Sequence, residues 1–307
     1  MKKTIIKVIV SVGLFFLLSR LVDFGELWQT IATANLAFFL LGAAVVAFNY
    51  FIGAVRWSVL LEEDSPSFLT LLKFYYLGGF FNNFMPSSVG GDAYKMYRLG
   101  KELGDGVQGI AATFMDRFVG LFALFCLSSF GLISFLGIRG LGVFLAFLVL
   151  AAIGLWFLKF ASPWHPKIAE FQGLIYAYQN KYRVLLKAFL LSFGVQLCSV
   201  GAQLLAFRAL DLYPPLGKAF FVLPLINFIA FLPISFNGLG VQDILFSRAF
   251  PLLGVAGESA VAASLVYHAM RFVISLVGGL IYALEAFGNG TPPPKEVEES
   301  VSTSSRV

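Results

Sequence analysis

The stretch Asn82-Asn83-Phe84-Met85-Pro86-Ser87-Ser88-Val89-Gly90-Gly91-Asp92 interrupts an otherwise apolar chain with polar residues, proline and glycine. A second stretch, Pro233-Ile234-Ser235-Phe236-Asn237-Gly238-Leu239-Gly240-Val241-Gln242-Asp243, has the same character. Backbone broken by Pro and Gly at membrane depth is tolerated only where protein or a water-filled cavity satisfies its polar groups. Two such breaks in corresponding halves of a chain indicate a substrate path between the halves.

The sequence around these breaks is typical of a polytopic membrane protein. Its 307 residues are 59% hydrophobic and 13% charged, with a mean hydropathy of +0.84, whereas soluble domains carry about 25% charged residues. The net charge of +5 is spread over short loops beside apolar spans, so nucleic acid is not expected as a partner. The two cysteines, Cys126 and Cys198, lack metal or disulfide spacing, and no metal or other cofactor is expected.

Hydropathy predicts an all-α fold with about six full transmembrane helices. They are placed at about 4–21, 35–56, 107–136, 141–160, 184–210 and 258–287. Two further apolar stretches, about 67–85 and 219–236, lead into the breaks and are interpreted as re-entrant hairpins. Residues 1–287 then form a single transmembrane domain, and the polar tail 288–307 is expected to be disordered and cytoplasmic.

The distribution of positive charge predicts the orientation of these spans. With the N-terminus inside, fifteen of the 22 Lys and Arg residues fall on the inner side and five on the outer side, which obeys the positive-inside rule. The order span, span, hairpin, span occurs in residues 1–138 and recurs, starting from the opposite side, in residues 139–287. The sequence therefore predicts an inverted-topology repeat, with both termini cytoplasmic.

The first break is a candidate anion site. Gly90 and Gly91 allow close approach of backbone, and N–H groups at such a turn can hold an anion. Lys95 and Arg98 follow on one face of a helix, so the stretch is a plausible cradle for a lipid phosphate. Alternatively, the glycines only make a tight hairpin and the two cations extend to lipid head groups.

The second break offers the same elements in Gly238 and Gly240. Asp92 and Asp243 are interpreted as caps of the helices that follow the breaks. The amides of Asn82, Asn83 and Asn237 either satisfy backbone groups freed at the breaks or contact substrate.

Four ionisable residues are predicted inside spans, where they are costly and usually paired. Asp116 and Arg117 lie about ten residues inside the third span, and Arg271 lies near the middle of the last, one turn after His268. We expect Asp116 to pair with Arg271. Such a pair either serves substrate binding or only clamps the two halves together. No Ser/His/Asp array, metal cluster, nucleotide-binding loop or pair of catalytic carboxylates can be assembled, so the chain is not expected to be an enzyme.

The ordered motifs resemble one known family. The motifs follow one another in this order: Pro86-Ser87-Ser88-Val89-Gly90-Gly91-Asp92, then Met115-Asp116-Arg117-Phe118-Val119-Gly120-Leu121, then the second break, and finally Ala263-Ser264-Leu265 with Gly278-Gly279-Leu280-Ile281-Tyr282. In this order they are similar to the motifs of the lysylphosphatidylglycerol synthase transmembrane region family, also called flippase-like or UPF0104 membrane proteins. The resemblance covers about residues 1–287. It implies the flippase-like half of the two-domain synthases without their aminoacyl-transferase half.

These observations predict a translocator in the inner membrane of a prokaryote, which moves a phospholipid or lipid-linked head group between leaflets. Alternatively, the chain is a membrane-embedded transferase or a non-transporting accessory protein in a glycolipid or phospholipid pathway, with a lipid-modifying enzyme as partner. The predicted substrate-binding residues are Asn83, Ser87, Gly90, Gly91, Lys95, Arg98, Arg117, Ser235, Asn237, Gly238, Gly240 and Arg271. The predicted structural or coupling residues are Pro86, Asp92, Asp116, Pro233, Asp243 and His268.

Overall fold

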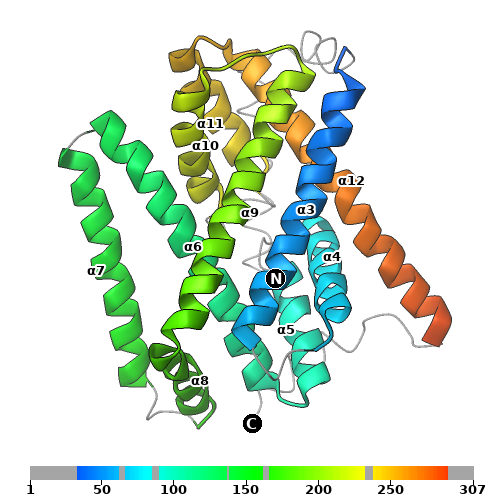
Figure 1. Cartoon of the computed structure of the whole chain (residues 1–307), viewed down its shortest axis with the longest axis vertical. Coiled ribbons are helices and arrows are strands. Elements are labelled where there is room, and N and C mark those ends of the chain that lie inside the picture. Colours follow the sequence, from blue (N-terminus) through cyan, green and yellow to red (C-terminus); the bar gives the residue numbers. More distant parts are fainter. Residues whose placement is uncertain are drawn as a thin grey trace, which may run out of the picture.

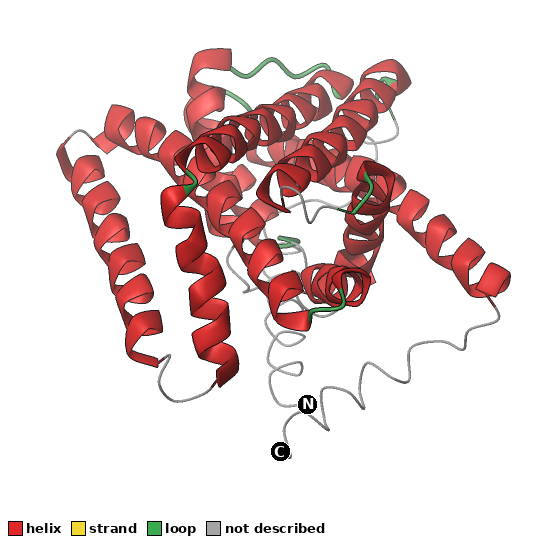
Figure 2. Cartoon of the chain, turned by 60° about the horizontal axis from the view of Figure 1, so that its bottom comes forward, coloured by secondary structure: helices red, strands yellow, loops and turns green. Residues whose placement is uncertain are grey.

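The computed structural model describes residues 33–61, 66–84, 90–136, 138–161, 166–231 and 238–289, and this part of the chain is helical without strands (Figures 1 and 2). The predicted span 4–21, the polar tail beyond residue 289 and the centres of both breaks lie outside the described residues. Five predicted residues, Pro86, Ser87, Pro233, Ser235 and Asn237, are therefore not placed.

Ten α-helices occupy the described part of the chain. They are α3 (Leu36–Leu61), α4 (Phe68–Phe84), α5 (Gly90–Leu103), α6 (Gly106–Leu136), α7 (Ile138–Ala161), α8 (Pro166–Ala177), α9 (Tyr182–Ala209), α10 (Leu216–Phe231), α11 (Val241–Ala249) and α12 (Gly257–Asn289). Short 3₁₀ turns, Tyr178–Asn180 and Phe250–Leu253, precede α9 and follow α11.

Within the described residues, four helices are long and apolar enough to cross a membrane. They comprise α3, α9 and most of α6 and α12, and they coincide with the spans predicted at 35–56, 107–136, 184–210 and 258–287. The span predicted at 141–160 falls on α7. The chain is thus a multi-pass helical membrane protein.

Helices α3 and α9 run side by side and share the most extensive helix–helix contact among the described helices (Figure 1). Polar contacts join the two helices, because Asn49 donates hydrogen bonds to the Val195 carbonyl (2.7 Å) and to Ser199 Oγ (3.0 Å). In an apolar environment these bonds satisfy a side chain that would otherwise be costly to bury.

Each predicted break joins two helices. Helices α4 and α5 pack together in the lower part of the view in Figure 1, and α10 and α11 pack together in the upper part. Helix α4 contacts α12 and α10 contacts α6, while α5 contacts α6 and α11 contacts α12. Each helix pair is therefore packed against long helices from both halves of the chain.

Two aromatic and aliphatic clusters fill these packing regions. Around α11, the rings of Phe207, Phe246 and Phe250 stack with centroids 4.4–5.8 Å apart and belong to an apolar core. Around α4, Trp57 and Phe74 pack with Leu71 and Leu77.

Candidate functional site

The carboxylate of Asp116 in α6 is the centre of a buried ionic cluster. Its Oδ1 accepts a hydrogen bond from Arg56 Nε (2.7 Å), its Oδ2 accepts one from the Tyr75 hydroxyl (2.6 Å), and Lys95 Nζ lies 3.7 Å from Oδ2. Asp116 is 1% exposed. The expected pair between Asp116 and Arg271 is wrong, because the cations beside this carboxylate come from α3 and α5.

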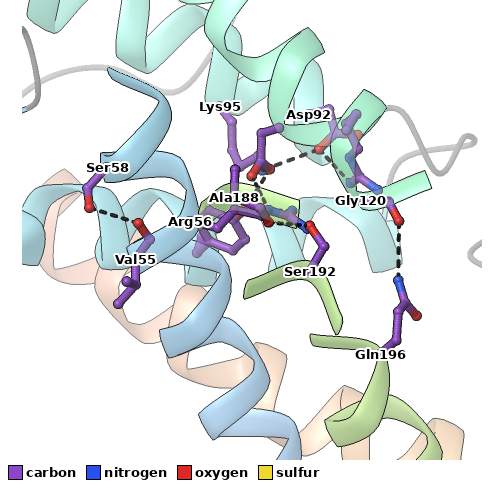
Figure 3. Close-up of polar contacts among 12 residues, drawn as sticks. Val55, Arg56, Ser58, Asp92, Lys95, Gly120, Ala188, Ser192 and Gln196 are labelled. Carbon is purple, nitrogen blue, oxygen red and sulfur yellow. Dashed lines mark hydrogen bonds and ion pairs between the residues drawn. The ribbon is translucent and has the colours of Figure 1, made fainter. Parts of the chain in front are cut away.

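Arg56 is the member of this cluster that sequence reasoning missed. The predicted span ended at residue 56, which put the guanidinium at the membrane surface, whereas α3 continues to Leu61 and buries it. Arg56 Nη1 also donates to Ser192 Oγ at 3.0 Å. Figure 3 shows Arg56, Ser192 and Lys95 converging at this point. The signal available in the sequence was an arginine within a continuous apolar run.

The second carboxylate of the cluster is Asp92, in the first turn of α5. Its Oδ1 accepts a hydrogen bond from Arg117 Nη2 (2.5 Å) and lies 3.6 Å from Lys95 Nζ. Asp92 thus serves as counter-ion to two cations. The residues just before α5, which its predicted capping role concerns, lie outside the described residues, so that role stays a prediction. Lys95 thus bridges Asp92 and Asp116, and its ammonium also lies over the Tyr75 ring, 4.0 Å from the centroid, which adds a cation–π attraction.

Gly91 is required by packing between helices. Its N–H donates to Asn82 Oδ1 at 2.8 Å, so this N–H is not available to a phosphate. A Cβ at Gly91 would lie 1.9 Å from the Gly78 carbonyl oxygen of α4. The alternative in which an asparagine amide satisfies the freed backbone is confirmed for Asn82. Gly90 begins α5.

Arg98 does not join Lys95 in a common cradle. Its guanidinium forms a two-pronged pair with Glu285 of α12, at 2.8 and 3.1 Å, while Lys73 also pairs with Glu285. Lys95 instead points into the bundle and is 4% exposed. Both cations lie on α5, three residues apart, as the sequence predicts. Arg98 pairs with Glu285 of α12, whereas Lys95 lies beside Asp92 and Asp116.

The second break has the predicted left-handed glycines. Gly238 has φ 85° and Gly240 has φ 81°, values that residues other than glycine rarely adopt. Asp243 Oδ2 accepts the Gly240 N–H at 2.9 Å, so Asp243 caps the start of α11 as expected. Its Oδ1 accepts the Ser264 hydroxyl (2.6 Å) and lies 3.3 Å from His268 Nε2.

A central cavity of about 450 Å³ lies between the two halves of the chain. Six charged residues line it: Arg56, Asp92, Lys95, Asp116, Arg117 and Arg271. The remainder of the wall carries amides and hydroxyls as well as apolar groups, among them Asn49, Gln196, Ser199 and Asn227. Gln196 reaches the Gly120 carbonyl on this wall (Figure 3).

The cavity brings together only part of the predicted site. Lys95, Arg117 and Arg271 lie on its wall, and Arg271 also lies over the Tyr267 ring at 5.6 Å. The described residues Asn83, Gly90, Gly91, Arg98, Gly238, Gly240, Asp243 and His268 are outside the lining. Asn83 instead joins α4 to α12 through a 2.5 Å hydrogen bond to Ser275.

Among the described residues that line the cavity, two have a buried nitrogen without a hydrogen-bond partner: Arg117 at Nε and Gln242 at Nε2. Gln242 is 2% exposed, and a buried amide without a partner is costly. Both groups donate and neither nitrogen accepts. Independently of these two atoms, cations outnumber carboxylates among the charged residues of the wall.

The fold and the cavity define a multi-pass helical membrane protein with a polar, charged chamber enclosed by apolar helices. The chain belongs to the family described as "Lysylphosphatidylglycerol synthase TM region", whose model matches residues 4–279. It is also similar to a UPF0104 membrane protein from Methanothermobacter thermautotrophicus, with 21% identity over 328 aligned positions that cover 92% of this chain and 93% of the relative.

Proposed function

We propose that this protein moves lipids with an anionic head group between the two leaflets of the membrane. The central cavity carries this proposal, because four cations and two carboxylates line a chamber inside an apolar bundle. Charged side chains at this depth are costly to bury, so they are usually paired and usually mark a functional site. A lipid head group that crosses there exchanges its water shell for these donors, while its acyl chains stay in the bilayer.

An inverted repeat of residues 1–138 and 139–287 supplies the architecture for this movement. The reciprocal contacts support it, since α4 packs on α12 as α10 packs on α6, and α3 packs along α9. Asp92 lies 25 residues before Arg117, and Asp243 lies 25 residues before His268, its neighbour. In this proposal the α4–α5 and α10–α11 pairs are re-entrant hairpins from opposite sides, and the halves rock around the cavity.

The proposed orientation puts the N- and C-termini in the cytoplasm of a prokaryotic cell. Single cysteines at the exposed positions Lys101, Lys181, Arg139 and Lys218 test it in a background that lacks Cys126 and Cys198. Membrane-impermeant maleimide should label positions 139 and 218 in intact cells, and positions 101 and 181 only after permeabilisation. Labelling of positions 101 and 218 from the same side would contradict the inverted repeat.

Translocation itself is tested with the purified protein in liposomes that contain fluorescent phosphatidylglycerol or phosphatidylcholine. The protein should accelerate flipping of the anionic lipid more. Arg117→Gln should slow it about tenfold, the equivalent of losing one charge-assisted contact. Lys218→Gln, which removes a charge from an exposed site outside the cavity, is the matched control. Rates equal to protein-free liposomes for every lipid would refute the proposal.

An accessory role is the second candidate, and the description of the family favours it, because that description names a synthase. In that role the membrane helices present lipid to a separate lipid-modifying enzyme. The same liposomes discriminate the two functions. Flipping by the protein alone supports translocation, whereas flipping or lipid modification that requires an added enzyme supports the accessory role.

A further inference from the structure

The two halves of the chain carry ionic pairs at corresponding positions. In the first half, Asp92 lies in the first turn of α5 and pairs with Arg117 of α6. In the second half, Asp243 lies in the first turn of α11, and Nε2 of His268 in α12 lies 3.3 Å from its Oδ1. Each partner follows its carboxylate by 25 residues. The pairs differ in their cations, because arginine stays protonated, whereas histidine changes its charge between about pH 5 and 8.

The carboxylate of Asp243 has its hydrogen bonds without His268. Its Oδ2 accepts the Gly240 N–H at 2.9 Å, and its Oδ1 accepts the Ser264 hydroxyl at 2.6 Å. Both donors are neutral, and Asp243 is 1% exposed. His268 Nε2 forms no hydrogen bond within the described residues, so its attraction to the carboxylate depends on charge. Within that part of the chain, the negative charge of Asp243 is therefore balanced only when His268 carries a proton.

Few titratable groups surround His268 in the described part of the chain. From α11, Asp243 is its ionic partner. On α12 itself, the Tyr267 ring lies 6.2 Å from the imidazole, and Arg271 follows one turn later with its guanidinium over the same ring. From α3, Tyr50 shares the cavity wall with Tyr267 and Arg271. Helices α4 and α9, which also pack on α12, supply no ionic partner to His268 among the described residues. A proton that arrives here is therefore held between one imidazole and one carboxylate.

This pair lies directly behind the cavity wall. Gln242 and Tyr267, the chain neighbours of Asp243 and His268, line the cavity. The His268 side chain is 11% exposed and that of Asp243 is 2% exposed, so the imidazole is the more accessible of the two. Asp243 also caps the start of α11 through the Gly240 N–H. A change of charge on His268 therefore acts on the contact between α11 and α12, beside the second break.

We propose that Asp243 and His268 form a proton-binding site that couples lipid movement to a proton gradient. This inference rests on the proposed function. His268 takes up a proton at Nε2 from water on one side of the membrane and releases it on the other, and no other bond changes. The protonated pair ties α11 to α12, and the neutral imidazole releases this tie. Ionisable side chains inside membrane proteins serve as proton relays in transporters. The proton moves together with the head group, because a singly charged anion and a proton carry no net charge across the bilayer.

Nitrogen-15 NMR of tag-free, full-length protein tests the proton site directly. The chain has two histidines, so His165→Gln leaves a single imidazole signal in histidine-labelled protein. The ring shifts of His268 should move from the protonated to the neutral values between about pH 5 and 8. Shifts that stay constant across this range would overturn the proton site. This measurement needs no lipid and is independent of the proposed function.

A pH gradient across liposomes tests the coupling. The liposomes contain the protein and fluorescent phosphatidylglycerol, with valinomycin and equal potassium on both sides to hold the membrane potential at zero. If one proton moves with each lipid, a gradient of one pH unit should concentrate the lipid up to about tenfold in the leaflet on the alkaline side, since both correspond to about 1.4 kcal/mol. Protein-free liposomes give the spontaneous distribution. Equal leaflets, or accumulation on the acid side, would overturn the inference.

Variants connect the coupling to this pair. His268→Gln cannot be protonated, and His268→Arg keeps a permanent charge as Arg117 does in the first half. Both should lose the accumulation, whereas His165→Gln, which removes the other histidine of the sequence, should keep it. Flipping without a gradient is measured first, so that loss of coupling is read from variants that still flip. Accumulation retained in His268→Gln would overturn the assignment. If neither His268 variant folds, the NMR titration and the wild-type gradient decide.

The two measurements separate this inference from the proposed function. Flipping that does not respond to the pH gradient would leave lipid movement standing and overturn the proton coupling. Titration of His268 in a protein that flips no lipid would refute the proposed function, and the coupling with it.

Discussion

The α4–α5 pair and the α10–α11 pair are both packed against α6 and α12, but they differ in the groups buried around their second helices. Around α5, Arg56, Lys95 and Asp116 form a buried ionic cluster. Around α11, the matching space is filled by stacked rings of Phe207, Phe246 and Phe250. A buried charge depends on every partner, whereas an aromatic core tolerates small changes. The difference predicts that substitutions of single charged residues around the first pair cost more stability than substitutions around the second.

The largest expected effect is at Gly91. Gly91→Leu should abolish folded protein, because its Cβ alone would overlap the Gly78 carbonyl and overpacking against backbone cannot be relieved by a rotamer change. Gly217→Leu in α10 is the control, since a Cβ there meets no atom within 4 Å. Yield of monodisperse protein measures both. A folded Gly91→Leu protein with normal yield would contradict the close α4–α5 contact.

The second effect compares the two carboxylates that organise each region. Asp116→Ala should destabilise the protein by about 3–5 kcal/mol, because Arg56 is left buried without its counter-ion. Asp243→Ala should cost about 1–3 kcal/mol, since it mainly leaves a hydroxyl and an N–H unsatisfied. Thermal melts in detergent measure both changes.

A double variant sharpens this comparison. Arg56→Met combined with Asp116→Leu should recover part of the loss, because an apolar pair of similar volume needs no counter-ion. Recovery is partial because Lys95 keeps only Asp92. A double variant as unstable as Asp116→Ala would mean that the Arg56–Asp116 pair is not the origin of the effect.

A smaller effect is expected for the hydroxyl that supports Asp243. Ser264→Ala removes a 2.6 Å hydrogen bond to a buried carboxylate that keeps its bond from the Gly240 N–H, which should cost about 1 kcal/mol. Thr113→Val removes a buried hydroxyl in α6 that bonds only the Gly109 carbonyl of its own helix, so it should be nearly neutral. Equal shifts in melting temperature would show that Ser264 acts through packing alone.

The smallest effect is expected at Arg98. Arg98→Gln should cost about 1 kcal/mol or less, because its pair with Glu285 is partly exposed and such pairs contribute little. It should leave the ratio of anionic to zwitterionic lipid flipping unchanged, while Arg117→Gln lowers that ratio. If Arg98→Gln abolished the preference for anionic lipid, Arg98 would have to be assigned to the binding site.

Sequence reasoning predicted the long apolar helices that the structure describes, because apolar runs are local signals. It also selected Lys95, from its place after the first break, and Arg117 and Arg271, because charges within apolar spans stand out; the structure places all three on the cavity wall. The partners were not predictable in the same way. Arg56 and Asp116 are 60 residues apart, and their contact depends on how α3 and α6 pack.

Gly91 shows the same limit. Its sequence context, two glycines before a helix, is typical of a ligand-binding turn. Only the position of Gly78 on α4 reveals that the glycine makes room for a neighbouring backbone. A pattern in one segment does not specify which surface will lie against it.

The contact between α4 and α12 also sets a time order for biosynthesis. A Cβ at Gly278 would lie 2.0 Å from the Tyr76 carbonyl oxygen, so these helices meet backbone to backbone, although about 200 residues separate them. At roughly 5–20 residues per second of synthesis, α4 waits about 10–40 s for its partner. During that interval the insertion machinery or lipid must cover the surface of α4 around Tyr76, which Gly278 of α12 covers in the finished protein.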